Sequence, residues 1–265
     1  MRLDKYLSDK HKVDSRTKSK KLIIYGYVKV NGVLVTDPNF DVDENDFVEI
    51  DKENNITSFV SRGSLKLIKA IEAFNLDINN KVCLDIGAST GGFTDVLIKN
   101  GAKLVYAVDV GKDQLHKSLK ENKKVISFES FDARDIKEDS FNQSFDVITS
   151  DLSFISLKLL ADTFDKVMRE NSDLIVLIKP QFESGKIKRK NGIFNDNNLH
   201  INAINNIILS FSKHNMHLNN ICKSPIAGGK GNVEYLALFK RTASDLIFDI
   251  RKLVNESLSR WTYAK

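Results

Sequence analysis

The sequence predicts an α/β protein with a doubly wound, mostly parallel sheet and a small N-terminal α+β domain. From residue 82 onward, short apolar runs rich in branched residues alternate with segments of helical spacing, as in successive βαβ units. The first run, 82–86, leads through a glycine-rich turn into a helix, which is typical of a nucleotide-type site. Before residue 51, helical segments precede two β-rich runs joined by an Asn-Gly pair, which indicates a hairpin.

Composition limits the class of protein. With 265 residues, 42% of them hydrophobic, the chain can bury a core, which excludes overall disorder. A net charge of +5 and a pI near 9.0 favour a polyanionic partner, although excess charge also serves solubility. Cys83 and Cys222 lack metal-ligand spacing, so we expect a reducing compartment and no metal site. Without a signal segment or a run of about 18 apolar residues, the protein is expected to be cytoplasmic, with no membrane partner.

The N-terminal segment predicts two helices and a hairpin. Helical spacing of apolar residues indicates one helix over 2–7 and a second over 15–25, ended by Gly26. The hairpin is expected over 27–35, and a further strand over 47–50.

Positive charge is concentrated in this segment, whereas acidic residues gather later, at 41–46. This asymmetry predicts one basic face for RNA phosphates, with an ordinary solvated surface as the alternative. The basic residues are Arg2, Lys5, Arg16, Lys18, Lys20, Lys21 and Lys29.

The order of these features resembles a known RNA-binding domain. Arg2-Leu3-Asp4, the basic second helix and Val28-Lys29-Val30-Asn31-Gly32 follow one another as in the small domain of ribosomal protein S-four. The resemblance covers residues 1–56 and implies binding of structured RNA through its shape and backbone.

A change of composition marks the domain boundary. The stretch 51–58 is polar and has no clear period, so we place a linker at 57–62 and a second domain at 63–265. Arg62, in the linker, joins the candidates for RNA binding. A helix is expected over 64–74, and Lys66 lies off its apolar stripe, where it is free to point at a site.

Beyond the run 82–86, the second domain alternates strands and helices. Strands are expected at 104–110, 125–128, 146–150, 174–178 and 234–239. Helices are expected from Gly92 and at 114–119, 157–168, 199–213 and 244–258, the last with Ile247 on its buried stripe.

The glycine turn favours S-adenosylmethionine over NAD. Its second glycine position carries a side chain, where a pyrophosphate would need close approach, and S-adenosylmethionine has no pyrophosphate. The predicted cofactor-binding residues here are Asp85, Gly87, Ala88, Ser89, Thr90, Gly91, Gly92 and Phe93.

Two later acidic positions extend this prediction. Asp109 ends the next strand, where a carboxylate can bind both ribose hydroxyls of an adenosine; a solvated strand-end residue is the alternative. Asp132, followed by Ala133, comes after the third strand and can accept from an adenine amino group; its alternative is a turn residue. Asp151 is counted among the cofactor contacts as well.

Four charged residues fall at element ends that face the same site. They are Lys66, Asp151, Lys179 and Glu234. Taken singly, each is ordinarily a surface residue or a helix cap, but the joint pattern is much harder to obtain by accident.

This set, with Asp85-Ile86-Gly87-Ala88-Ser89-Thr90-Gly91-Gly92-Phe93-Thr94, resembles the FtsJ-type ribose 2′-O-methyltransferases. Together with the N-terminal domain it resembles the TlyA, or hemolysin A, family, and 192–200 with Asp196 matches as well. The resemblance implies a Rossmann-like class I methyltransferase fold whose last strand is antiparallel. It also implies S-adenosylmethionine as cofactor and cytidine riboses of ribosomal RNA or ribosomal subunits as substrate.

A 2′-hydroxyl must lose its proton as it attacks a sulfonium methyl, which calls for a base. We expect Lys179 to be that base, with Lys66 and burial under RNA disfavouring its charge and Asp151 holding the amine. Glu234 is expected to orient Lys66 or the hydroxyl. Two alternatives are a membrane-active haemolysin, against which the lack of an apolar span argues, and a non-catalytic RNA-binding protein.

Overall fold

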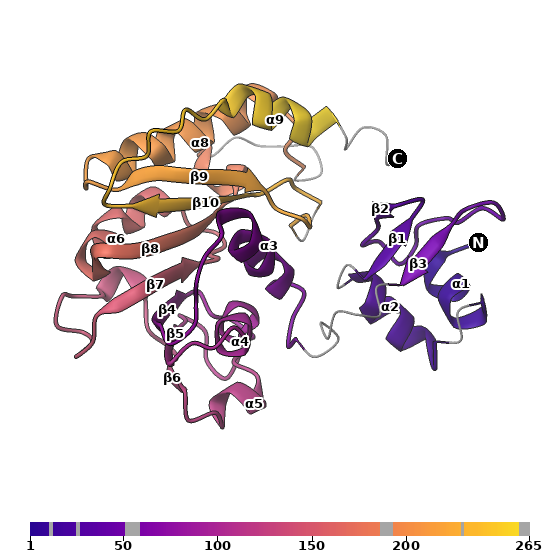
Figure 1. Ribbon diagram of the computed structural model, residues 1–265, viewed down its shortest axis with the longest axis horizontal. Coiled ribbons are helices and arrows are strands. Elements are labelled where there is room, and N and C mark those ends of the chain that lie inside the picture. Colours follow the sequence, from indigo (N-terminus) through magenta and orange to yellow (C-terminus); the bar gives the residue numbers. More distant parts are fainter. Residues whose placement is uncertain (11–12, 25–26, 51–58, 186–192, 229–230, 260–265) are drawn as a thin grey trace. The chain divides into compact units, whose positions relative to one another are not determined.

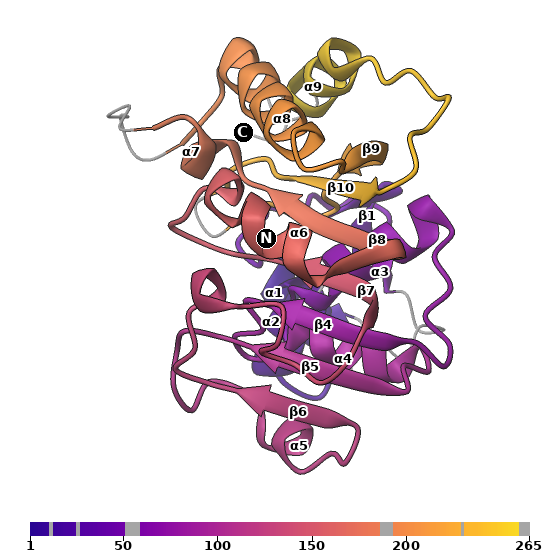
Figure 2. The same ribbon diagram turned by 90° about the vertical axis from the view of Figure 1, so that its left-hand side faces the viewer.

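The computed structural model describes residues 1–10, 13–24, 27–50, 59–185, 193–228 and 231–259. Their contacts divide the chain into two compact units, Met1–Leu65 and Lys66–Lys265. Each unit has a hydrophobic core of its own. Figures 1 and 2 show the elements of both units from two directions.

The first unit packs two helices against a three-stranded antiparallel sheet of order β2-β1-β3 (Figure 1). Between β1 and β2, Asn31 and Gly32 have φ of 52° and 75°, and a type I′ turn needs positive φ at both positions. The predicted helices and hairpin are confirmed, while the predicted helix end at Gly26 lies outside the described residues. The elements are α1 (Leu3–Lys10), α2 (Arg16–Ile24), β1 (Val28–Val30), β2 (Val33–Leu34) and β3 (Val48–Ile50).

The second unit is built on a seven-stranded sheet of order β6-β5-β4-β7-β8-β10-β9. Neighbouring strands from β6 to β8 are parallel, and β10 runs antiparallel to both β8 and β9. This confirms the predicted mostly parallel sheet with an antiparallel last strand. The strands are β4 (Val82–Ile86), β5 (Leu104–Val108), β6 (Val125–Phe128), β7 (Phe145–Ser150), β8 (Met168–Ile178), β9 (His217–Lys223) and β10 (Tyr235–Lys240).

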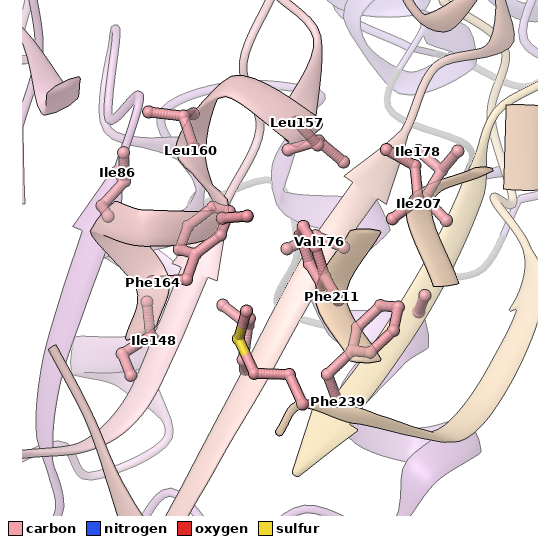
Figure 3. Close-up of a cluster of buried hydrophobic side chains, with 14 of the residues drawn as sticks. Ile86, Ile148, Leu157, Leu160, Phe164, Val176, Ile178, Ile207, Phe211 and Phe239 are labelled. Carbon is pink, nitrogen blue, oxygen red and sulfur yellow. The ribbon is translucent and has the colours of Figure 1, made fainter. Parts of the chain in front are cut away.

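Helices cover both faces of this sheet, so its central strands are largely buried on both sides. On one face, side chains of α6, α8 and α9 pack on β4, β7, β8 and β10 in a single core cluster (Figure 3). The opposite face carries α3 and α4 (Figure 1). The helices are α3 (Ser64–Phe74), α4 (Gly92–Lys99), α5 (Lys117–Lys120), α6 (Ala161–Val167), α7 (Pro180–Glu183), α8 (Asn197–Ser212) and α9 (Ile250–Ser259), with short 3-10 turns at Ala133–Asp135 and Leu157–Leu160.

One strand of the sheet was not predicted. β9 lies at the sheet edge, and every one of its residues is half-buried. Its sequence, His-Leu-Asn-Asn-Ile-Cys-Lys, lacks the apolar run of a central strand because an edge strand has neighbours on one side only.

The structure also corrects several predicted helix bounds. The helix expected at 157–168 is a 3-10 turn followed by α6, and Met168 already begins β8. The helix expected at 244–258 begins only at Ile250, so Ile247, which is 98% exposed, is not part of its buried stripe. The helix expected at 114–119 is the short α5, which begins at Lys117.

Candidate active site

The strand directions bring four charged side chains to one edge of the sheet. Asp151 follows β7 and Lys179 follows β8, which is parallel to β7. Glu234 comes directly before β10, and because β10 is antiparallel to β8, its first residue pairs with the last residue of β8. Lys66, in the first turn of α3, reaches the same place from the helix.

The four side chains form a continuous chain of alternating charge. Lys179 Nζ lies 2.7 Å from Asp151 Oδ1, and Lys66 Nζ lies 3.2 Å from Asp151 Oδ2 and 2.9 Å from Glu234 Oε2. Lys66, Lys179 and Glu234 are 7%, 6% and 2% exposed, so these charges are tolerated only because each has a partner. Two cations and two anions balance one another.

At Asp151 and Lys66, the neighbouring charges together shift the pKa more than burial does. Burial disfavours the carboxylate of Asp151, but the ammonium groups of Lys66 and Lys179 lower its pKa below its ordinary value. Burial likewise disfavours the ammonium of Lys66, but Asp151 and Glu234 raise its pKa. Asp151 is therefore ionised and Lys66 protonated at neutral pH, so Lys66 is a poor candidate for a base.

The glycine turn before α4 has a conformation that only glycine adopts easily. Gly87 and Gly91 have φ of 86° and 94°. A Cβ on Gly87 would lie 3.1 Å from the carbonyl oxygen of Asp151, and one on Gly91 would lie 2.2 Å from the Leu119 side chain. The turn is thus held close to Asp151 on one side and packed under α5 on the other.

Asp109 lies beside this turn, as the sequence predicts. Its Oδ2 accepts from Ser89 N at 2.8 Å and its Oδ1 accepts from Gly111 N at 2.7 Å, which fixes the carboxylate against the turn. Ser89 Oγ also donates to Gln114 Oε1 at 3.3 Å. Each carboxylate oxygen keeps a lone pair for a further donor.

The carboxylates of Asp85 and Asp132 accept hydrogen bonds from other groups of the protein. Asp85 is fully buried and accepts from the hydroxyls of Thr94 and Thr149 at 2.6 and 2.9 Å. Asp132 accepts from Arg134 N at 2.9 Å, which caps the 3-10 turn that begins at Ala133, and it pairs with the Arg134 guanidinium. Asp132 thus has the contacts of a turn residue, although its side chain stays 28% exposed.

Basic residues of the first unit gather around one buried carboxylate. Asp4 is fully buried; Arg2 and Arg16 each lie 3.0 Å from its Oδ2, and Lys20 lies 3.9 Å away. The three cations are about half exposed, at 45%, 51% and 47% of their side chains, so the cluster keeps a net positive charge open to solvent.

The other predicted RNA-binding residues are not part of this Asp4 cluster. Lys18 pairs with Asp14, and Lys5 and Arg62 are exposed. The side chain of Lys21 lies outside what the structure describes.

Known protein families match both units. Residues 59–241 match the FtsJ-like methyltransferase family and residues 1–48 match the S4 domain. The chain is 44% identical to "Hemolysin A" of Brachyspira hyodysenteriae over 90% of this chain and 99% of the relative. It is 34% identical to the "16S/23S rRNA (cytidine-2'-O)-methyltransferase TlyA" of Mycobacterium tuberculosis over 92% and 91% of the two chains. The chain belongs to the TlyA/hemolysin A family of FtsJ-like methyltransferases.

Solved structures agree with this membership. The structure of "Putative hemolysin from Streptococcus thermophilus" matches with a TM-score of 0.75 and 33% identity, over 99% of this chain and 97% of that one. A hemolysin structure from Lactococcus lactis, also called putative, matches with a TM-score of 0.71 and 39% identity, over 75% and 97%. This TlyA-family chain therefore shares its fold with proteins named after lysis.

The part of this TlyA-family chain that the structure describes has no helix long and apolar enough to cross a membrane. Within the same residues, no group of three or more His, Cys, Asp or Glu side chains could hold a metal ion.

Sequence reasoning missed the side chains that surround the four charged residues. Lys179 Nζ donates to Ser153 Oγ at 2.8 Å and lies 5.9 Å from the centre of the Phe182 ring. Gln181 Nε2 donates to Glu234 Oε1 at 3.3 Å. Their only signal was their place directly after Asp151 and Lys179, in Asp-Leu-Ser-Phe and Lys-Pro-Gln-Phe.

One exposed aromatic residue was missed as well. Phe154 is 91% exposed, has a φ of 66°, and its ring centre lies 5.2 Å from that of Phe182. A large apolar ring held open to solvent beside the site offers a surface on which a base can stack.

Proposed function

We propose that this protein transfers a methyl group from S-adenosylmethionine to the 2′-hydroxyl of cytidine in ribosomal RNA. The observation that carries the proposal is the buried, charge-balanced chain from Lys179 through Asp151 and Lys66 to Glu234, next to the glycine turn. Family membership supports the reaction class, and the printed names of the TlyA relatives support rRNA cytidine as substrate.

The residues beside the turn fit S-adenosylmethionine. The cradle at Gly87 and Gly91 has no room for side chains, and Asp109 presents carboxylate oxygens to a pair of ribose hydroxyls. Ala88, Ser89, Thr90, Gly92 and Phe93 complete the proposed cofactor-binding turn, with Asp132 and Ala133 beside the adenine. Asp85 would act indirectly, by supporting the turn from inside the core. When bound, the cofactor supplies a sulfonium methyl group for attack.

Lys179 is the proposed base. As a neutral amine it would take the proton of the 2′-hydroxyl while the new O–C bond forms and the bond between the methyl group and the sulfonium sulfur breaks, and Asp151 and Ser153 hold the amine in place. Lys66 is protonated at neutral pH and cannot take that role. Lys66 instead keeps Asp151 ionised and is itself held by Glu234. The four residues thus align one amine with the attacking oxygen, and alignment is the main need of a methyl transfer.

The S4 domain is the proposed docking site for rRNA. The Asp4 cluster fixes Arg2, Arg16 and Lys20 as a preformed group of cations, which suits phosphates of a structured RNA. Lys5, Lys18, Lys21 and Arg62 would add charge to this surface. A ribosomal RNA substrate supports a cytoplasmic location for the protein.

Methyl transfer can be tested directly. Purified protein and labelled S-adenosylmethionine are incubated with rRNA from cells that lack the protein, and 2′-O-methylation is mapped by mass spectrometry. The expected result is label on a cytidine ribose. Label on a base, or cofactor binding without transfer, would contradict the proposal. Lysis of red cells by protein that binds no S-adenosylmethionine would favour a haemolysin instead.

A further inference from the structure

Two segments beside the active site are fastened to each other along their length. The first is the loop Asp151–Leu157, which follows β7, and the second is Lys179 with the one-turn helix α7, which follows β8. At the near end, Lys179 contacts Asp151 and Ser153, and in the middle the rings of Phe182 and Phe154 meet. Lys179 thus holds the start of the loop and the Phe182 ring contacts its middle, which leaves the far end of that loop to be held.

Glu183 holds that far end. Its Oε2 accepts from Ser156 Oγ at 2.5 Å and its Oε1 accepts from Leu157 N at 2.8 Å. Glu183 is only 5% exposed, and both donors are neutral. Burial raises the pKa of Glu183 above its ordinary value, although the two hydrogen bonds act in the opposite direction.

A buried carboxyl group with two neutral donors is a costly way to stabilise a loop, since an apolar side chain could fill the same space. Its benefit is geometric. It joins the last residue of the α7 turn, four residues after Lys179, to the end of the loop that carries Ser153 and Phe154. Because Ser153 accepts from Lys179, a shift of this loop moves a partner of the proposed base.

We propose that Glu183 is a positioning residue for methyl transfer: it fixes the loop Ser153–Leu157 so that Ser153 and Phe154 face Lys179 and the target nucleotide. This inference rests on the proposed function and adds to the site a residue that touches neither cofactor nor substrate. It predicts that loss of Glu183 slows the transfer step without weakening cofactor binding.

The test compares Glu183→Ala with Glu183→Gln in the full-length protein. In Glu183→Ala, kcat with rRNA should fall about tenfold to a hundredfold, as expected for a misplaced catalytic group. The dissociation constant for S-adenosylmethionine should stay at the wild-type value. Glu183→Gln can still accept from Leu157 and donate to Ser156, and should recover most of the lost kcat. If Glu183→Ala does not fold, Ser156→Ala can be used instead, because it removes the hydroxyl that donates to Glu183.

Asp146→Ala is the matched control. Asp146 Oδ2 accepts from Val82 N at 2.8 Å, a carboxylate-to-backbone bond where the central strands β4 and β7 begin, at the other end of these strands from the site. Its loss should lower stability and leave kcat unchanged. A kcat in Glu183→Ala that falls no further than in this control would overturn the proposal, as would the lack of recovery in Glu183→Gln.

Hydrogen exchange of the loop amides gives a second readout that needs no activity. Exchange over Ser153–Leu157 should be faster in Glu183→Ala than in wild type, and unchanged exchange there would overturn the proposal. If wild-type protein transfers no methyl group to rRNA, the proposed function fails, and this exchange measurement still decides whether Glu183 fixes the loop.

Discussion

At the scale of single residues, the two lysines of the site differ in what they touch. Lys66 lies between two carboxylates, Asp151 and Glu234. Lys179 contacts one carboxylate, a hydroxyl and the face of an aromatic ring. The two carboxylates raise the pKa of Lys66 and so hold a proton on it, which leaves Lys179 as the proposed base.

Replacement of Lys179 by alanine should reduce methyl transfer to rRNA by at least about a hundredfold, because it removes the base from the transition state. Binding of S-adenosylmethionine, measured by calorimetry, should be nearly unchanged. Lys240→Ala is a suitable control, because Lys240 pairs with Asp173 at 2.8 Å toward the other end of β10. Full transfer by Lys179→Ala, with normal cofactor binding, would refute the assignment.

Asp85 should make stability depend on pH. Burial raises its pKa from 3.8 to about 6, against the opposing bonds from Thr94 and Thr149. The folded protein thus keeps a proton that the unfolded chain releases, so this contribution to stability is full below about pH 4 and is lost as pH rises through about 6. The free energy of unfolding should therefore drop by about 1 kcal/mol from pH 5 to pH 7 on account of this group.

Urea unfolding of wild type and Asp85→Asn at both pH values measures this contribution. An amide does not titrate, but it can still accept from one threonine and donate to the other. The pH dependence of Asp85→Asn should therefore be smaller by that amount. Equal pH dependence in the two proteins would show that Asp85 does not titrate in this range.

At the scale of elements, the β4–α4 turn depends on the short helix α5 that covers it. Gly91→Ala combines an unfavourable positive φ with a clash against Leu119, and should cost about 2 kcal/mol or more. Gly185→Ala is the control, because Gly185 has a φ of 68° with nothing within 4 Å of the added Cβ. The difference between the two variants in urea unfolding measures the clash alone. Equal losses of stability in the two variants would mean that α5 moves away from the added methyl group at no cost in free energy.

The elements that the sequence predicts well are those whose local pattern matches their burial. β4 is buried over its whole length, and apolar except for Asp85, because helices cover both faces, and the hairpin is marked by Asn31-Gly32. β9 was missed because an edge strand is half-exposed, and Ile247 was misplaced because apolar spacing at 244–250 continues ahead of the actual helix start. The sequence pattern of a segment does not show which elements will pack against it or where that packing ends.

The charged residues of the site were predictable for a related reason. Lys66, Asp151, Lys179 and Glu234 are polar residues at the ends of apolar elements, so the sheet topology brings them together. Ser153, Gln181 and Glu183 follow the same strands, but their roles depend on how two chain segments meet, which no single segment encodes. Asp4 was named only as part of Arg2-Leu3-Asp4, because two of its partners, Arg16 and Lys20, lie on the second helix.

At the scale of the whole molecule, the two units carry different parts of the proposed function. The FtsJ-like unit holds the glycine turn and the four charged residues, while the S4 unit holds the Asp4 cluster. Substitutions in one unit should therefore alter a different kinetic constant from substitutions in the other.

The double variant Arg16→Gln/Lys20→Gln tests this division, since Arg2 remains to compensate Asp4. Loss of phosphate contacts should raise KM for rRNA and leave both kcat and cofactor affinity unchanged. The slope of log KM against log salt should also decrease, by about 1 for each lost contact. Lys117→Gln, on an 85% exposed side chain of α5, is the control for a lost surface charge. A fall in kcat with an unchanged KM would instead place these cations in the catalytic step, because a docking contact acts before the chemistry begins.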